Sequence, residues 1–234
     1  APGTMEGART PVKAVIFDLG GVVLGSPLKA LTRLEEAHNL PKHALKRILG
    51  HPRSAFSRLE CNQISLSTFS EQFEAECKSQ GLELRAQDVL PHIFKPAQTV
   101  SREMVSAIKV LRRHGIKTAA LTNNFWYGHD RTHPFNRFGR LAELFDVMVQ
   151  SREEGVRKPD PLIYQRCLSR LGVAPQECIF LDDIGSNLKY PASIGIRTIK
   201  VEDPGVAVEK LQRLLCLPLA DKEPGERFVH LAKL

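Results

Sequence analysis

Residues 12–23 read V-K-A-V-I-F-D-L-G-G-V-V. The run from Val12 to Phe17 is nearly continuous in apolar, β-branched character, which is typical of a strand buried on both faces of a parallel sheet. Asp18 follows directly, so its carboxylate is expected at the carboxyl end of the strand, where open α/β sheets bind their ligands. A carboxylate in that position can act as a nucleophile or as a metal ligand.

The later part of the chain predicts more strands of the same kind. Four further short apolar runs are bounded by polar or glycine-rich turns, at 117–121, 146–149, 178–181 and 196–201. Amphipathic helical patterns alternate with them, at 101–114, 161–171, 185–194 and 205–215. Strands that alternate with helices predict the α/β class, with a Rossmann-like core built on one parallel sheet.

The interval between the first two predicted strands is different. Residues 24–116 show no convincing strand and instead carry helical patterns at 28–38, 44–49, 65–78 and 86–93. These patterns predict an α-helical cap domain that is inserted above the strand ends. The sequence therefore divides into a core of residues 12–24 plus 100–217, a cap insert of residues 25–99, and tails at 1–11 and 218–234.

Composition narrows the classes of function. The chain has 234 residues, of which 42% are hydrophobic and 25% are charged, and this is ordinary for a globular protein. No window approaches the roughly 18 uninterrupted apolar residues that a membrane span needs. The net charge is +7, but lysine and arginine are interleaved with glutamate and do not gather on one predicted helix face. This pattern favours an anionic small substrate over a nucleic acid.

Cysteine usage predicts a reducing compartment. The chain has five cysteines, far apart and without a C-x-x-C pair, which argues against a disulfide framework and against a zinc site. Residues Ala232-Lys233-Leu234 are close to the peroxisomal signal Ser-Lys-Leu, so a cytoplasmic and a peroxisomal location are both open. The sequence also leaves open a homodimer, or a partner domain within a larger protein.

Polar side chains stand at four places where predicted strands end or a helix begins. In chain order they are Asp18, the pair Thr122 and Asn123, Lys158, and the pair Asp182 and Asp183. Each signal alone is weak, because an aspartate after a strand often caps a helix and a Lys-Pro step often starts one. Their common position relative to the predicted strands makes the combination specific, since the carboxyl ends of parallel strands share one edge of the sheet.

Together these groups predict a phosphoryl-transfer site. Asp18 and Asp183 can share a hard cation such as Mg²⁺. The hydroxyl of Thr122, the donors of Asn123 and the ammonium of Lys158 can hold a phosphoryl group while Asp18 attacks phosphorus. Water would then cleave the aspartyl-phosphate.

Four motifs resemble those of the haloacid dehalogenase superfamily. They are F-D-L-G-G-V-V at 17–23, L-T-N-N at 121–124, R-K-P-D-P at 157–161 and F-L-D-D-I-G-S-N-L-K at 180–189. The similarity covers residues 12–217 and is strongest to the N-terminal phosphatase domain of soluble epoxide hydrolases and to the N-terminal domain of large acyl-CoA dehydrogenase-family proteins. The resemblance implies a Rossmann-like core, a helical cap, Mg²⁺ and hydrolysis of a small-molecule or lipid phosphate monoester.

The resemblance also implies a role for each matching position. Asp18 is the implied nucleophile, and Thr122 and Lys158 are the implied phosphoryl contacts. The implied metal ligands are Asp18, the backbone carbonyl of Gly20, and Asp183, with Asp182 alongside.

Residue 20 departs from the family pattern, because glycine stands where the acid/base aspartate is usual. Loss of that group costs about 10²- to 10⁴-fold in rate. Three interpretations follow: hydrolysis persists for good leaving groups, another residue or water takes the role, or the domain is a catalytically weak phosphate-binding or regulatory module. Metal-independent dehalogenation through Asp18 is disfavoured, because the acidic pair Asp182-Asp183 suits a metal.

Two further features follow the second motif. Phe125, Trp126 and Tyr127 are expected either to form an apolar wall for a lipid-like tail or to pack beneath the cap. His129 and His133 have a ligand-like spacing, but their polar surroundings favour solvated surface side chains.

Overall fold

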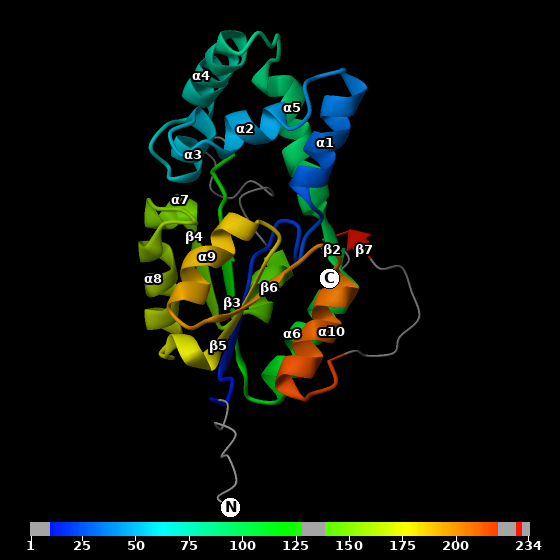
Figure 1. Ribbon diagram of the computed structural model, residues 1–234, viewed down its shortest axis with the longest axis vertical. Helices are drawn as coiled ribbons and strands as arrows, with labels where there is room; N and C mark the ends of the chain where they lie inside the picture. Colours follow the sequence, from blue (N-terminus) through cyan, green and yellow to red (C-terminus); the bar gives the residue numbers. More distant parts are fainter. Residues whose placement is uncertain (1–9, 128–138, 220–227, 231–234) are drawn as a thin grey trace, which may run out of the picture.

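The computed structural model of the chain describes residues 10–127, 139–219 and 228–230. Five strands form one parallel sheet in the order β4-β3-β1-β5-β6 (Figure 1). Their bounds are Ala14–Phe17 for β1, Lys117–Thr122 for β3, Val147–Gln150 for β4, Cys178–Asp182 for β5 and Arg197–Lys200 for β6. The predicted α/β class and Rossmann-like parallel sheet are thereby confirmed.

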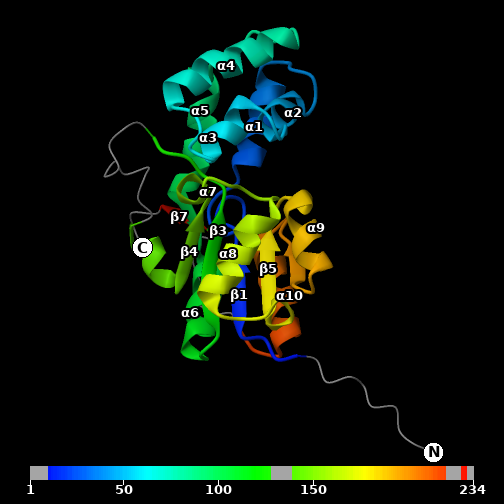
Figure 2. The ribbon, with the colours of Figure 1, turned by 90° about the vertical axis from the view of Figure 1, so that its left-hand side faces the viewer.

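Helices cover both faces of the sheet, as Figures 1 and 2 show. On one face lie α6 (Arg102–Arg113) and α10 (Pro204–Leu215), and on the other α8 (Pro161–Leu171) and α9 (Gly185–Ser193). Successive side chains of a strand point to opposite faces. Val15 and Phe17 therefore enter one apolar cluster, and Ala14 and Ile16 enter the other. Burial on both faces explains why the strand sequence is apolar throughout.

The helices α1 to α5 lie together beyond the carboxyl ends of the strands (Figure 1). They are α1 (Pro27–Ala37), α2 (Ala44–Gly50), α3 (Ala55–Glu60), α4 (Leu66–Ser79) and α5 (Ala86–Phe94), and we call them the helical insert. The insert has an apolar cluster of its own, in which the rings of Phe69 and Phe73 stack with centroids 5.4 Å apart. The exact core and cap boundaries stay a prediction.

Helix α3 is absent from the sequence prediction. It has six residues and begins after Ser54, whose side-chain oxygen accepts a hydrogen bond from the backbone N–H of Ser57. A helix of fewer than two turns shows too little periodicity to be recognised, and its stability comes from this cap and from packing.

A second, two-stranded sheet corrects one expectation. Strand β2 (Thr99–Ser101) pairs antiparallel with β7 (Phe228–His230), although residues 24–116 were expected to hold no convincing strand. Three-residue strands whose partners are this distant in sequence carry no local pattern.

Beside β2 runs the chain that leaves β1 for the insert. The backbone N–H of Ser101 donates to the carbonyl of Val23 at 2.8 Å, and that of Gly25 donates to Thr99 at 3.0 Å. The two passages between the core and the insert are therefore hydrogen-bonded to each other.

The remaining elements are short. They are the helix α7 (Ser151–Glu154) and the 3-10 helices η1 (Pro96–Gln98), η3 (Gly139–Leu144) and η4 (Pro175–Glu177). Within the described ranges, no helix is long and apolar enough to cross a membrane. All five cysteines are free thiols.

Candidate active site

The candidate site lies where the strand order changes direction. Strand β1 pairs with β3 on one side and β5 on the other, so that Phe17 is level with both Ala120 and Leu181. Asp18 after β1, Thr122 at the end of β3 and Asp182 at the end of β5 consequently share one edge of the sheet. Such a switch point is where doubly wound sheets bind ligands.

Lys158 joins these strand ends through its ammonium group. The side chain is completely buried, and its Nζ lies 2.9 Å from Asp18 Oδ1, 2.7 Å from Asp182 Oδ2 and 2.8 Å from the carbonyl oxygen of Leu121. An ammonium group has three hydrogens to donate, so all three are engaged. Lys158 thus links β1, β3 and β5 at one point.

Asn123 holds the backbone of Lys158. Its Oδ1 accepts from the Lys158 N–H at 2.9 Å, and its Nδ2 donates to the Lys158 carbonyl at 3.0 Å. The side chain of Asn123, one of the two kinds of donor expected there, is thus occupied in fixing the lysine loop. The phosphate contact of Asn123 stays a prediction.

Asp182 is held by four hydrogen bonds. Oδ1 accepts from the Ile184 N–H at 2.8 Å and from Asn187 Nδ2 at 3.1 Å, while Oδ2 accepts from Lys158 and, at 3.1 Å, from the same Asn187 nitrogen. Asn187 was not identified from the sequence. Its position could have indicated the contact: Asn187 lies in the first turn of α9, five residues after Asp182, so its side chain can point back toward the end of β5.

The carboxylate of Asp183 lies close to the backbone at Gly21. A Cβ on Gly21 would lie 2.1 Å from Asp183 Oδ2, and Gly21 has φ +80°, so a side chain there would be both strained and in collision. Burial, with Asp182 adding to its effect, raises the pKa of Asp183 to about 6.

The charges in this cluster do not balance. Burial raises the pKa of Asp18 well above its ordinary value, and Lys158 only partly opposes that rise. Burial acts to lower the pKa of Lys158, but Asp18 and Asp182 outweigh it and raise the pKa. Three carboxylates facing one ammonium leave surplus negative charge in a site where only Asp183 is partly exposed to solvent.

A divalent cation fits this surplus. Asp18, Asp182 and Asp183 each offer a carboxylate oxygen, and these oxygens lie within 4.8 Å of one another. Carboxylate and carbonyl oxygens are the ligands that hard cations prefer. The chemistry of the donor set, and the raised pKa values of Asp18 and Asp183, both suit a divalent cation.

Two neighbouring positions complete the site. Thr122 is buried, and its hydroxyl lies 3.4 Å from the carbonyl oxygen of Asn123, a long hydrogen bond that a better acceptor can replace. A Cβ on Gly20 would meet only the ring of Pro27, at 3.5 and 3.7 Å, which is ordinary contact. Residue 20 therefore has room for a Cβ.

An ion pair between the partly exposed Arg157 and the buried Glu60 connects the lysine loop to the helical insert. The Nε of Arg157 lies 2.9 Å from Oε2 of Glu60 in α3, and an Arg157 nitrogen also donates to the hydroxyl of Ser57. Burial raises the pKa of Glu60, although Arg157 and Lys158 oppose that shift. The residue before Lys158 is thus attached to the insert.

The three aromatic residues after β3, 125–127, have different surroundings. Phe125 is buried in the cluster of the insert, with its ring centroid 5.6 Å from that of Phe56. Trp126 and Tyr127 instead line a cavity. Residues His129 and His133, as well as Ala232-Lys233-Leu234, lie outside the described residues.

Comparison with known proteins identifies related sequences. The family model of the haloacid dehalogenase-like hydrolases matches residues 12–195. The chain is 38% identical to acyl-CoA dehydrogenase family member 10 of Mus musculus over 97% of its own length and 21% of that protein. It is 32% identical to bifunctional epoxide hydrolase 2 of Sus scrofa over 87% of its length and 39% of that protein. The chain therefore spans well under half of either relative.

Smaller relatives match over most of their length. A phosphorylated carbohydrates phosphatase of Thermotoga maritima is 27% identical, over 80% of this chain and 84% of that protein. The fold resembles a HAD-like family hydrolase from Porphyromonas gingivalis, with TM-score 0.63, 24% identity and coverage of 88% of this chain and 98% of that one. It also resembles a Bacteroides thetaiotaomicron HAD family enzyme in complex with magnesium and inorganic phosphate, with TM-score 0.56, 16% identity and coverage of 82% and 96%.

Proposed function

The chain belongs to the haloacid dehalogenase-like hydrolase family, and from this premise we propose that it is a Mg²⁺-dependent phosphatase that hydrolyses a phosphate monoester through an aspartyl-phosphate on Asp18. The observation that supports this most directly is the buried cluster in which Lys158 contacts both Asp18 and Asp182 while Asp183 stands free of the lysine. Relatives that are named phosphatases agree with it.

Asp18 is suited to attack phosphorus because its Oδ1 is held in place by hydrogen bonds, which orients the carboxylate. Oδ1 accepts from the Leu19 N–H at 2.7 Å and faces Lys158, whereas no bond to Oδ2 is found among the described residues. In the proposed reaction an Asp18 oxygen forms a bond to phosphorus, and the bond from phosphorus to the ester oxygen breaks. The leaving alkoxide takes a proton from solvent water, since Gly20 offers no acid. A water molecule then attacks phosphorus and gives up a proton to solvent, the bond to Asp18 breaks, and inorganic phosphate leaves.

Other residues hold the groups in place. The hydroxyl of Thr122 and the backbone N–H of Asn123 would bind the phosphoryl oxygens, and Lys158 would do so by exchanging its contact with Asp18 for one with the phosphoryl group. Asp18, Asp183 and the carbonyl of Gly20 would hold Mg²⁺, which supplies positive charge that stabilises the developing phosphoryl charge. Asp182 has both oxygens engaged, so we assign it to positioning Lys158 and, at most, to an outer contact with the ion.

The first test is the metal dependence of hydrolysis. With an aryl phosphate as substrate, turnover is expected to rise with Mg²⁺, to vanish with a chelator, and to return when Mg²⁺ is added back. Release of phosphate and of the phenol in equal amounts should accompany it. Unchanged turnover after chelation would overturn the metal part of the proposal.

Two adjacent glycines provide a matched pair for the metal site. Gly21→Ala is expected to weaken Mg²⁺ binding at least about tenfold, because the new Cβ would displace the Asp183 carboxylate. Gly20→Ala adds the same methyl group where space exists, and should bind Mg²⁺ like the parent protein. Calorimetric titration measures both. Equal losses in the two variants would show that Asp183 does not hold the ion.

In this proposal, residue 20 determines whether the protein can protonate the leaving group. Gly20→Asp is expected to raise kcat about tenfold to a hundredfold for an alkyl phosphate and less for an aryl phosphate, since only the poor leaving group needs an acid. Gly20→Asn, of nearly the same size, is the control. Equal gains for both substrates, or for both variants, would contradict the missing-acid explanation.

Glycine at residue 20 also favours an alternative proposal, a phosphate-binding or regulatory module with little catalysis. One measurement distinguishes this module from the proposed phosphatase. A binding module would take up inorganic phosphate in the presence of Mg²⁺ and show no turnover of an aryl phosphate above that of Asp18→Asn.

A further inference from the structure

Arg157 of the core meets one face of helix α3 in the helical insert. Its Nε lies 2.9 Å from Oε2 of Glu60, and another of its nitrogens donates to the hydroxyl of Ser57. Ser57 and Glu60 are three residues apart in α3, so they lie on the same face of that helix. The guanidinium is thereby held at two points on α3, while the next residue along the chain is Lys158.

Helix α3 is itself fixed within the insert. The backbone N–H of Ala55 donates to Oε1 of Glu76 in α4 at 2.8 Å, and a nitrogen of Arg58 donates to Gln72 of the same helix. The side chain of Leu59 is buried in the apolar cluster of the insert. The position of α3, and with it that of the Arg157 contact, is therefore set by the insert as a whole.

On the core side, Arg157 belongs to the short loop that carries Lys158. The backbone N–H of Asp160 donates to the carbonyl of Arg157 at 2.8 Å, and Asn123 holds the backbone of Lys158. The ammonium of Lys158 has its three contacts at 2.7 to 2.9 Å, so a shift of the loop would break at least one of them. The placement of Arg157 therefore bears directly on that of Lys158.

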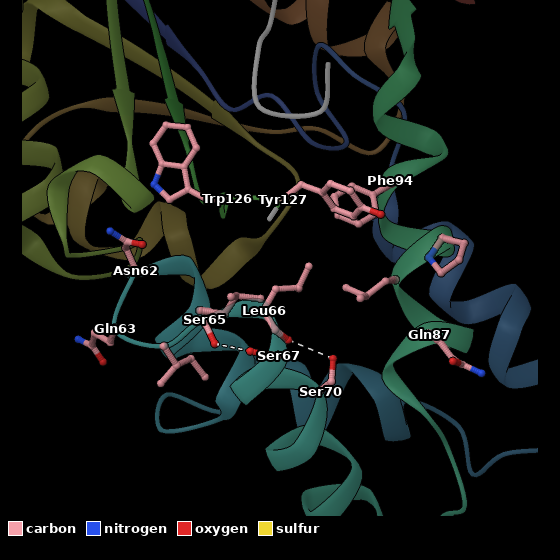
Figure 3. A pocket seen from close by; sticks show the side chains of 14 residues that line it. Asn62, Gln63, Ser65, Leu66, Ser67, Ser70, Gln87, Phe94, Trp126 and Tyr127 are labelled. Atoms are coloured by element: carbon pink, nitrogen blue, oxygen red, sulfur yellow. Dashed lines mark hydrogen bonds between the residues drawn. The ribbon is translucent and has the colours of Figure 1, made fainter. Parts of the chain in front are cut away.

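A cavity adjoins the contact between Arg157 and α3. Leu59, the neighbour of Glu60, lines this space of about 740 Å³ together with Leu66 of α4 and Trp126 of the core (Figure 3). Across a cavity no atoms touch, so it cannot hold the insert and the core in register. The ion pair at its border consequently carries more of the alignment between α3 and the lysine loop.

The attraction between Arg157 and Glu60 is one of charge. Although Nε and Oε2 are 2.9 Å apart, neither atom makes an aligned hydrogen bond among the described residues. The side chain of Glu60 is buried, and an apolar side chain of similar size often stabilises a buried position as well or better. Stability alone therefore does not account for a carboxylate here, whereas a role in orienting Arg157 does.

The proposed reaction gives that orientation a use. Lys158 would exchange its contact with Asp18 for one with the phosphoryl group, so one of its three contacts changes. The ammonium can meet the phosphoryl oxygen only if the lysine backbone stays in place during the exchange. Asn123 holds that backbone from β3, and Arg157 holds it from the insert.

We propose that Glu60 is a positioning residue for Lys158 and acts through Arg157, so that the helical insert sets the affinity of the core for a phosphoryl group. This inference rests on the proposed phosphatase function and adds a residue of the insert to its site. Loss of the Glu60 charge releases Arg157, lets the lysine loop shift and weakens the contact of Lys158 with phosphate.

Glu60→Gln and Glu154→Gln form a matched pair of test and control. Glu154 pairs with Arg166 and Arg170, and its side chain is 7% exposed, as is that of Glu60. With saturating Mg²⁺, Glu60→Gln is expected to raise the Kd of inorganic phosphate at least about fivefold and to lower kcat/KM for an aryl phosphate at least about tenfold. Glu154→Gln should change neither, and thermal unfolding confirms that both variants are folded. Equal Kd values in the two variants would overturn the proposal.

The affinity for Mg²⁺ separates positioning of the lysine from a general loosening of the site. A displaced Lys158 no longer competes with the ion for Asp18, so Glu60→Gln should bind Mg²⁺ as tightly as the parent protein or more tightly. A loosened site would instead lose affinity for Mg²⁺ and for phosphate together, and that result would count against the positioning role.

Arg157→Gln tests the route by which Glu60 acts. The double variant Glu60→Gln, Arg157→Gln should have the phosphate Kd of Arg157→Gln alone, whereas additive losses would mean that Glu60 acts without Arg157 and would overturn the route. Should Glu60→Gln not fold, Arg157→Gln changes a partly exposed position and is expected to show the same rise in Kd. No rise in that variant would refute the proposal.

The binding measurements also separate this inference from the proposed function. If the parent protein hydrolyses no aryl phosphate but Glu60→Gln still weakens phosphate binding, the phosphatase proposal fails and the positioning role survives. If the parent protein turns over and Glu60→Gln behaves like Glu154→Gln, the positioning role fails and the phosphatase proposal stands. A parent protein that binds no phosphate in the presence of Mg²⁺ would overturn the positioning role whatever its turnover.

Discussion

Asp18→Asn is expected to lower kcat/KM for an aryl phosphate at least about 10⁴-fold, because loss of a nucleophile from a cooperating site removes most of its catalysis. Asparagine has the shape of aspartate, and its amide oxygen can still accept the N–H of Leu19. It cannot form the acyl phosphate. The variant is therefore expected to keep the fold while losing the reaction.

Two measurements make that expectation specific. Rapid denaturation of the parent protein during turnover should trap phosphate on the peptide that contains Asp18, and the variant should trap none. Asp203→Asn is the control, because Asp203 caps α10 through the N–H of Val206, and asparagine caps equally well. Residual turnover in Asp18→Asn above one part in a hundred would assign the nucleophile to another group.

Lys158→Met is expected to cost about 3–5 kcal/mol of unfolding free energy as well as the activity, because it leaves Asp18 and Asp182 buried without a counter-charge. The carbonyl of Leu121 also loses its donor. Denaturant unfolding at neutral pH with a chelator present measures the loss without compensation by a cation. The double variant Lys158→Met, Asp182→Asn should recover part of it, since one of the two buried carboxylates is removed.

The control for this loss is a surface ion pair between a lysine and a glutamate, with a similar distance between nitrogen and oxygen. Lys200 lies 2.8 Å from Glu202, and both side chains are more than half exposed. Lys200→Met should change the unfolding free energy by no more than about 0.5 kcal/mol. Similar losses of unfolding free energy for the two lysines would mean that Asp18 and Asp182 do not need Lys158 as a buried counter-charge.

The sheet and the strand-end residues were predictable because they depend on local patterns. Buried parallel strands are apolar throughout, as at Ala14–Phe17, and the candidate aspartates stand at or just after the end of such a run. Asp18 and Asp182 then lie close together because parallel strands end at the same edge, and Lys158 reaches both from the loop before α8. What the sequence could not show was which partner each group prefers.

Asn123 and Asn187 illustrate that limit. Both have side chains that can bind phosphate, metal or protein, and only three-dimensional packing determines that one holds the Lys158 backbone and the other Asp182. The helix α3 and the strands β2 and β7 were missed for a related reason. They are too short for periodicity, and their stability comes from partners that are distant in the chain.

The attachments of the helical insert have a mechanical consequence. The paired passages at Val23 and Ser101 form one, and the ion pair between Arg157 and Glu60 forms another. The ring of Phe125, which follows β3 and is buried in the apolar cluster of the insert, forms a third. Contacts at three separate places resist both hinging and twisting of the insert against the sheet, so we expect the space beside Trp126 and Tyr127 to keep its width.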